Sequence, residues 1–357
     1  MSTRCIDIGF LEEKSNWLLH SRFFPSKVGG KPAWLDLKNI PNPSQLTCKK
    51  CSDPLIFLCQ VYAPFEESDS CFHRTIFIFI CRNGSCCQVN SSDNFIILRC
   101  QLPRKNDYYS FEPYEENEQE NFPMNKWPKL CSLCGLKGPS HCSKCKKVFY
   151  CSRKHQIIDW QKGHKEACSD LQKTNEFRIC SDHFIVTEAG KSILFKEWEL
   201  IVDEEDEEEA EHVDPNKEME KFKKLIQEKK AGTMSNVSDT ELEQYAGTLP
   251  EDKVFNKFTK RVARHPDQVL RYDRGGMPLW ITGHTENSIS YVPNCQYCDG
   301  ERQFEFQVMP QLLNYLNVGI EVNSIDWGVL AVYTCKASCD TGPAYKEEYL
   351  IKQDLTK

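Results

Sequence analysis

Eight of the cysteine and histidine side chains in one short segment of this chain have spacings typical of zinc ligands. The segment reads CSLCGLKGPSHCSKCKKVFYCSRKHQIIDWQKGHKEAC. Thiolate and imidazole are the ligands that tetrahedral zinc prefers, and eight of them fill two closed sites. Because every coordination position has a candidate ligand, we expect structural rather than catalytic zinc. The candidates are Cys131, Cys134, Cys142, Cys145, Cys151, His155, His164 and Cys168.

Two kinds of local structure would position these ligands. Each Cys-x2-Cys pair places both sulfurs on one tight turn. Cys151 and His155 stand four residues apart, as do His164 and Cys168, so each of these pairs shares one face of a helix. The segment has too little aliphatic material for a core of its own, so we expect the metal to supply its folding energy.

A second set of cysteines belongs to an internal repeat. The segment GGKPAW begins at Gly29 and the segment GGMPLW begins at Gly275. Each is followed by a loop, a Cys-x2-Cys pair, a strand-like run containing Gln-Val and another strand-like run that ends in cysteine. This shared order indicates a duplication. In the first copy we expect the glycine pair at positive φ to form a tight turn, and the tryptophan to anchor the first strand in the core.

We predict one structural four-cysteine zinc site in each copy. The first set is Cys48, Cys51, Cys81 and Cys86, with Cys87 as an alternative to Cys86, and the second is Cys295, Cys298, Cys335 and Cys339. The alternative is that these are free thiols packed in a core, because the second pair of each set has irregular spacing. Five other cysteines lack such partners and are expected to be buried or free thiols: Cys5, Cys59, Cys71, Cys100 and Cys180.

The strand-like runs predict a β-rich (α+β) fold. We expect two duplicated β-domains packed together, with the eight-ligand segment inserted as a double-zinc finger. The expected divisions are an N-terminal β-rich repeat (1–115), the finger (131–168), a strand segment returning to the body (169–202), an acidic insert (203–250) and a C-terminal β-rich repeat (251–357). Residues 112–128 are expected to form a linker.

Charged segments precede the second repeat. The acidic run 203–209 is expected to be solvated and disordered, although it could instead screen a basic client. We expect one short amphipathic helix from Glu218. A second follows Pro250, with one apolar face made by Val254, Phe255, Phe258 and Val262. Four arginines near that helix could bind a phosphate or an acidic partner, or form a solvated face: Arg261, Arg264, Arg271 and Arg274.

Composition narrows the function class. The 357 residues carry a net charge of −7, which argues against nonspecific nucleic-acid binding and suits a basic partner. The N-terminus lacks the apolar core of a secretory signal, and no apolar run approaches the roughly 20 residues of a membrane span. We therefore expect the chain in the cytosol or nucleus, where clustered cysteines more often bind metal than form disulfides.

Enzymatic activity is not expected. The chain has no Gly-rich cofactor loop, P-loop or Gly-x-Ser-x-Gly elbow, so we predict no catalytic and no organic-cofactor site. Its isolated histidines lack an evident cysteine, serine or aspartate partner. His73 could pack near the first four-cysteine site, although ordinary burial or exposure is the commoner environment.

The eight-ligand segment resembles a MYND zinc finger. The resemblance implies interleaved sites, in which Tyr150 and Trp160 also match the family pattern. One zinc would take Cys131, Cys134, Cys151 and His155, and the other would take Cys142, Cys145, His164 and Cys168. Fingers of this type are protein-interaction modules that usually bind short, often proline-containing peptides rather than DNA.

The order of all the parts resembles the programmed cell death protein 2 family. The matching segments are FPSKVGGKPAWL, QVYAP, QLPRKNDYYSFEP, the finger, EDKVFNKF, QVLRY, EFQVMPQLLNYL and SIDWGVLAVYTC. The resemblance implies a dedicated chaperone in 40S ribosome biogenesis. Such a protein binds a newly made, basic small-subunit ribosomal protein, and occurs in cytoplasm and nucleus. The alternative is an adaptor whose finger recruits proline-containing peptides of transcriptional corepressors, with a role in cell death or proliferation control.

Overall fold

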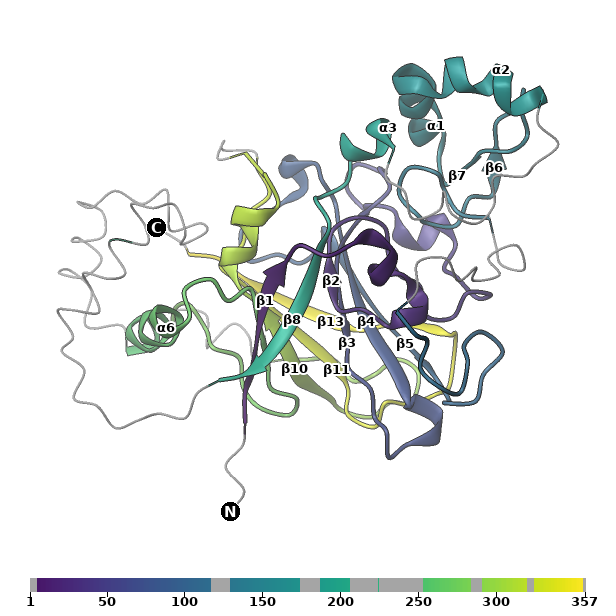
Figure 1. Cartoon of the computed structure of the whole chain (residues 1–357). Coiled ribbons are helices and arrows are strands. Elements are labelled where there is room, and N and C mark those ends of the chain that lie inside the picture. The colour runs from purple at the N-terminus through teal and green to yellow at the C-terminus, as the bar shows by residue number, and fades with distance from the viewer. Residues whose placement is uncertain are drawn as a thin grey trace.

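The computed structural model describes most of the chain (Figure 1). The described residues are 5–116, 129–173, 187–205, 224, 253–283, 291–319 and 324–355. Within them, no helix has the length and apolar character needed to cross a membrane. Residues 117–128, most of the expected acidic insert and the helix expected from Glu218 lie outside the described part.

Eleven antiparallel strands form one sheet. In spatial order they are β12 (Tyr345–Glu347), β5 (Phe95–Leu102), β4 (His73–Ile80), β3 (Ile56–Tyr62), β2 (Lys27–Val28), β8 (Trp198–Glu204), β1 (Asp7–Glu12), β9 (Leu270–Tyr272), β10 (Arg302–Val308), β11 (Val329–Cys335) and β13 (Tyr349–Gln353). A two-stranded sheet in the finger pairs β6 (Ser140–His141) with β7 (Phe149–Tyr150). The described helices are α1 (Arg153–Asp159), α2 (Lys165–Lys173), α3 (Glu188–Lys191) and α6 (Lys253–Arg264).

The two ends of the large sheet meet, so that it nearly closes into a barrel. Strand β12 pairs with β5 at one end, and after one residue the chain continues as β13, which pairs with β11 at the other end. The connecting residue, Glu348, donates its backbone N–H to the carbonyl of Ile97 in β5 over 2.9 Å. Strands from both halves thus share one continuous sheet, and the expected division into two packed domains stays a prediction.

The halves repeat a local geometry. The Gln60 side chain accepts a hydrogen bond from the backbone N–H of Ala33 at 2.9 Å and donates one to its C=O at 3.5 Å. The Gln307 side chain makes the same two hydrogen bonds with the backbone of Leu279, at 2.5 and 3.1 Å. In both halves the glutamine lies just after a β-bulge, which falls between Phe57 and Cys59 in β3 and between Phe304 and Phe306 in β10.

The two Gly-Gly-x-Pro-x-Trp segments differ in burial. Gly29 and Gly30 both have positive φ, as expected, and Trp34 is buried. In the second copy only Gly275 has positive φ, and Trp280 is half-buried against the small cluster of the C-terminal half. Trp34 packs on the rings of Phe77, Phe79 and Tyr345, and its indole N–H also bonds to the finger.

Helix α6 packs on the C-terminal half through the predicted face. Phe258 and Val262 are buried in a small cluster, and Phe255 packs against its edge. The remaining members of that cluster are Ile281, Met309 and Val329. The main core is larger and runs through the N-terminal half, the finger and the strands of the C-terminal half.

The expectation that the acidic run is disordered was wrong at its start, and the expectation that it is solvated was wrong at Glu205. Asp203 and Glu204 complete β8, which pairs with β1. Glu205 is buried and accepts hydrogen bonds from Arg271 at 2.7 Å and Arg261 at 3.1 Å. The two guanidinium groups lower the pKa of Glu205 against the opposing effect of burial. These arginines therefore bind an acid of the same chain, and the boundary of the strand moves past residue 202.

Candidate metal centres

The first group of finger ligands converges on one point. The ligand atoms of Cys131, Cys134, Cys151 and His155 all lie within 4.8 Å of one another, and all four residues are buried. The Cys134 and Cys151 sulfurs are 3.5 Å apart. Nδ1 of His155 lies 3.2 Å from the Cys151 sulfur and 3.7 Å from the Cys131 sulfur. These residues come from one knuckle, the end of β7 and the first turn of α1.

The second group comes from the other knuckle and from α2 with the turn before it. It contains Cys142, Cys145, His164 and Cys168, whose ligand atoms again lie within 4.8 Å of one another. The Cys142 and Cys168 sulfurs are 3.9 Å apart, and Nε2 of His164 lies 3.6 Å from the Cys145 sulfur. The structure thus brings together the interleaved sets that the MYND resemblance implies.

Local backbone features explain these positions. Gly135 and Lys146 turn the two knuckles with positive φ, and each donates its N–H to the carbonyl of the first cysteine of its knuckle at 2.9 Å. Ser152 caps α1, because its side chain accepts from the N–H of His155. A kink at Gly163, with φ of 147°, separates α1 from α2 and lets His164 join the second group.

The first four-cysteine group lies at one end of β3 and β4. Cys48, Cys51, Cys81 and Cys86 have sulfurs within 4.8 Å of one another, with 3.5 Å between those of Cys51 and Cys81. Ser52, at a positive φ of 60°, turns the knuckle. Cys87, the predicted alternative, instead donates its thiol to the carbonyl of Asp326 at 3.2 Å.

The second four-cysteine group lies at the corresponding end of β10 and β11. It contains Cys295, Cys298, Cys335 and Cys339, and Asp299 turns its knuckle at a positive φ of 58°. The sulfur of Cys295 is 3.7 Å from that of Cys339, and the sulfur of Cys298 is 3.6 Å from that of Cys335. This group is the most open of the four, because Cys298 is exposed.

The donor sets fit zinc. A tetrahedral ion with Zn–S bonds of about 2.3 Å separates its sulfurs by about 3.8 Å. The sulfur–sulfur distances of 3.5 to 3.9 Å are close to this value, whereas a disulfide requires about 2.05 Å. Burial would raise the pKa of Cys142, but hydrogen bonds from the backbone of Cys145 and from His164 lower it to about 6, whereas burial and the neighbouring Cys142 raise the pKa of Cys168 to about 11.

The cysteines outside the four metal groups have different surroundings. Cys59 and Cys100 are fully enclosed, and burial raises the pKa of each thiol to about 12. They are therefore neutral packing residues. Cys71 is also buried and Cys5 is exposed, whereas Cys180 lies outside the described residues.

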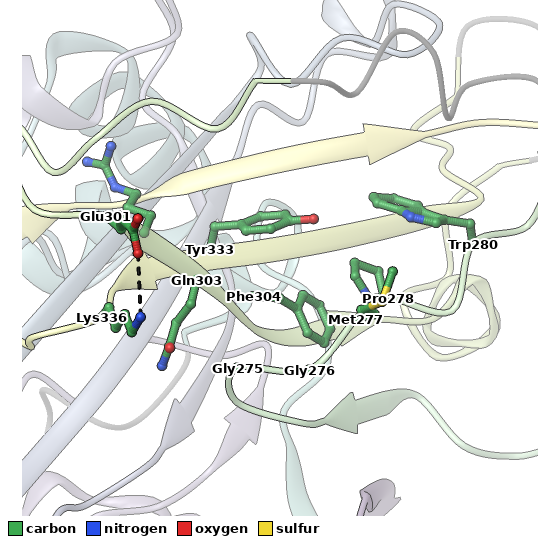
Figure 2. Close-up of a pocket in the computed structure, with 11 residues that line it drawn as sticks. Gly275, Gly276, Met277, Pro278, Trp280, Glu301, Gln303, Phe304, Tyr333 and Lys336 are labelled. Carbon is green, nitrogen blue, oxygen red and sulfur yellow. Dashed lines mark hydrogen bonds and ion pairs between the residues drawn. The ribbon is translucent and has the colours of Figure 1, made fainter.

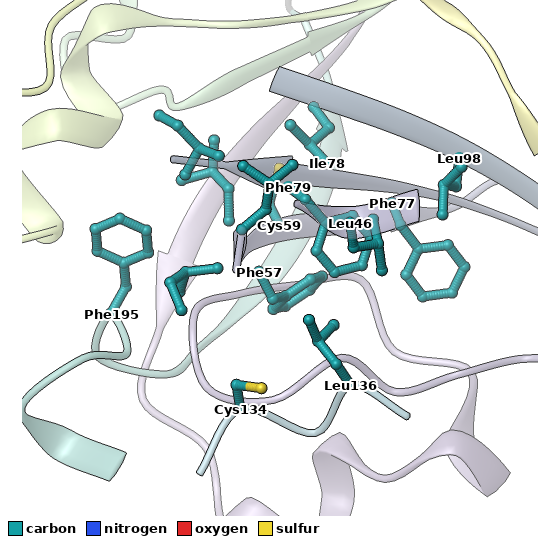
Figure 3. Close-up of a cluster of buried hydrophobic side chains, with 14 of the residues drawn as sticks. Leu46, Phe57, Cys59, Phe77, Ile78, Phe79, Leu98, Cys134, Leu136 and Phe195 are labelled. Carbon is teal, nitrogen blue, oxygen red and sulfur yellow. The ribbon is translucent and has the colours of Figure 1, made fainter. Parts of the chain in front are cut away.

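The finger is packed into the body, which the sequence did not predict. Leu133, Cys134 and Leu136 belong to the main core, and Figure 3 shows Cys134 and Leu136 against Phe57 of β3. Trp34 donates its indole N–H to the carbonyl of Gly135 at 2.8 Å. Leu133 and Leu136, within and just after the first knuckle, could have indicated this packing, because apolar side chains on a zinc knuckle favour burial against another surface.

Comparisons with known proteins identify the family of this chain. Residues 5–116 match the family model for the programmed cell death protein 2 N-terminal domain, 131–168 match the MYND finger and 252–354 match the programmed cell death protein 2 C-terminal putative domain. Programmed cell death protein 2 of Rattus norvegicus is 42% identical over 99% of this chain and 97% of its own length. The chain belongs to the programmed cell death protein 2 family.

More distant relatives extend this family. A programmed cell death protein 2-like protein of Mus musculus is 28% identical, over 89% of this chain and 86% of its own. The "Probable 20S rRNA accumulation protein 4" of Schizosaccharomyces pombe is 26% identical, over 88% and 87%. No solved structure matches this family member at a significant level.

His73 lies away from the metal centres of this family member. It is buried at the start of β4, whereas Cys81 follows the end of that strand. Its ring stacks on Phe24 at 4.1 Å between centroids, and its Nδ1 lies 2.9 Å from the Tyr62 hydroxyl. Burial, together with the positive charge of Arg104, lowers the pKa of His73 to about 4.

Because of His73, the free energy of unfolding should fall as the solution becomes more acidic. Its folded pKa of about 4 lies below the ordinary 6.5, so the unfolded chain takes up the proton first as pH falls through that interval. We expect His73→Gln to lose less stability than the parent between pH 6.5 and 5, measured by urea unfolding with zinc content checked at both pH values. Equal losses in the two proteins would contradict this assignment.

Proposed function

We propose that this protein is a non-enzymatic, zinc-stabilised escort for a basic small-subunit ribosomal protein, acting in cytoplasm and nucleus in support of 40S ribosome biogenesis. The observation that carries the proposal is the fission-yeast relative, whose name refers to 20S rRNA accumulation and which aligns over most of both chains. The alignment covers 88% of this chain and therefore includes most of the body, which supports placing the proposed activity there.

Charge supports this class of client. The net charge of −7 complements a ribosomal protein, which is basic and unprotected before assembly. Opposite charges speed encounter and discourage wrong partners, while the contacts at the interface set affinity. The nearly closed sheet and the four cysteine groups would provide a rigid scaffold on which such contacts are fixed.

The two halves of the body share features that support a common origin. The matching bulges and glutamine contacts support the proposal that the two halves arose by duplication. Each half would hold one structural zinc ion in its four-cysteine site, in addition to the two zinc ions of the finger. Catalysis is not part of the proposal. His73, buried and held by Tyr62, has the environment of a packing residue, and the metal groups are closed by four protein ligands each.

The alternative function is an adaptor that binds proline-containing peptides through the finger. One observation favours it. A hollow of about 310 Å³ lies beside the kink between α1 and α2, lined by Trp160, Gln161, Gly163, Lys165 and Glu166. Ile157, one turn before this hollow, is 43% exposed. A peptide with apolar side chains could bind along this face of the finger.

A pull-down separates the two functions. Because the finger contributes to the core, its deletion would damage the body, and a surface substitution is the better tool. We expect tagged wild-type protein and Ile157→Glu to retain the same small-subunit ribosomal protein in near-stoichiometric amount. If Ile157→Glu loses the main partners, and these are chromatin proteins, the adaptor function is correct instead.

A further inference from the structure

An aromatic pair occupies the same place in each half. In the N-terminal half, Phe57 faces Phe79 across β3 and β4, with 5.8 Å between ring centroids and 65° between ring planes. In the C-terminal half, Phe304 faces Tyr333 across β10 and β11 at 5.8 Å and 67°. Each pair lies at the β-bulge of its half, so the two sheet faces present nearly the same surface.

The first pair is covered by the finger. Cys134 and Leu136 pack over Phe57 (Figure 3), and Phe57 and Phe79 are fully buried. The covering turn centres on Gly135, whose carbonyl accepts the indole N–H of Trp34. A Cβ atom at Gly135 would lie 2.9 Å from Cβ of Lys31, so only glycine fits against the body here.

The second pair is less completely covered than the first, because Tyr333 is half-buried although Phe304 is only 4% exposed. Phe304 and Tyr333 line a hollow of about 550 Å³ together with Met277, Pro278 and Trp280 (Figure 2). Met277 and Pro278 correspond to the residues that Gly135 contacts in the first half, yet Met277 is 82% exposed. Within the described part of the chain, the Trp280 indole nitrogen forms no hydrogen bond. In the first half, the indole nitrogen of Trp34 donates a hydrogen bond to the backbone carbonyl of Gly135.

The charged groups at the rim are already paired. Lys336 lies 3.4 Å from Glu301, and Arg302 lies 2.9 Å from Glu348. The hollow therefore combines the apolar surfaces of Met277, Pro278 and Trp280 with the polar groups of Gln303 and Tyr333, and its rim charges are paired within the chain. A neutral segment that supplies a backbone carbonyl and an apolar side chain fits this surface better than a charged one.

We propose that this hollow binds a glycine-containing turn of the client polypeptide. The turn occupies the place that residues 134–136 take in the first half. Its carbonyl accepts the Trp280 N–H, its glycine lies on Met277 and Pro278, and the following aliphatic side chain covers Phe304 and Tyr333. This inference rests on the proposed escort function and assigns the surface that does the escorting.

The test compares two charged substitutions at exposed apolar positions. Met277→Glu lies in the hollow, and Val89→Glu, at a residue 68% exposed, lies in the N-terminal half outside it. Full-length variants are titrated with the small-subunit ribosomal protein that the wild type retains. We expect Met277→Glu to weaken binding at least about tenfold and Trp280→Phe to weaken it about threefold, with Val89→Glu unchanged. Unchanged melting temperature and zinc content verify folding.

Photo-crosslinking locates the bound segment. A benzophenone side chain at position 277 should attach to one client peptide that contains glycine, and the same group at position 89 should not. Equal affinity of Met277→Glu and Val89→Glu for the client overturns this site while leaving the escort function intact. If wild-type protein retains no ribosomal protein at all, the escort function itself fails, and this inference fails with it.

Discussion

Replacing Cys81 with serine is expected to remove about one zinc ion from the purified protein and to destabilise the N-terminal half severely. Cys81 ends β4, and its sulfur lies 3.5 Å from that of Cys51 in a buried group of four. Binding of structural zinc contributes about 10 kcal/mol or more in small metal-dependent folds. Losing even part of this binding free energy is comparable to losing the total stability of a domain, which is about 5 to 15 kcal/mol.

Cys59 provides the matched control. It is buried in the adjacent strand β3 but belongs to none of the metal groups, and its thiol is neutral. Cys59→Ser should therefore keep the full zinc content and lose only the modest stability expected for a polar atom in a core. Zinc content is measured on the folded fraction of both variants. An unchanged zinc content in Cys81→Ser would show that the first four-cysteine group is a cluster of packed thiols.

The second large effect is expected at Glu305. This buried carboxylate on β10 forms a two-pronged ion pair with Arg74 on β4, with one of the two bonds at 2.7 Å, and also accepts from Thr334 and Tyr272. Burial alone would raise the pKa of Glu305, but the charge and hydrogen bonds of Arg74 hold it below its usual value. Because β4 and β10 are far apart in the strand order, this pair spans the interior of the nearly closed sheet.

Glu305→Leu should lower the free energy of unfolding by about 3 to 5 kcal/mol, because it leaves the Arg74 guanidinium buried without its partner. The double variant Arg74→Met with Glu305→Leu removes both charges and should recover most of that loss. Chemical unfolding of the parent, the two single variants and the double variant measures the coupling. If Glu305→Leu alone is as stable as the parent, the two halves are not joined through this interior pair.

Local spacing was enough to predict the chemistry of the metal groups. Cys-x2-Cys pairs and four-residue Cys/His separations have few structural uses, so the finger ligands could be named before the fold was known. The repeat of Gly-Gly-x-Pro-x-Trp similarly led to the two four-cysteine sets. The same logic placed Phe258 and Val262 on the buried face of α6, since a helix repeats its apolar positions at a fixed period.

Contacts between distant segments could not be predicted in this way. No local pattern shows that Tyr345 of β12 pairs with Cys100 of β5 and so joins the ends of the sheet. Nor does a run of acids show that Glu205 meets Arg271 in the interior. The burial of Trp34 and the partial exposure of Trp280 have the same origin, because identical motifs acquire different neighbours once the chain folds.

The zinc content of the wild-type protein tests the central claim most directly. The structure groups sixteen cysteine and histidine ligands into four sets of four, two in the finger and two in the body. Native mass spectrometry of the purified full-length chain, paired with elemental analysis, should therefore give four zinc ions per chain. A value of two zinc ions per chain would contradict the account and leave zinc in the finger alone.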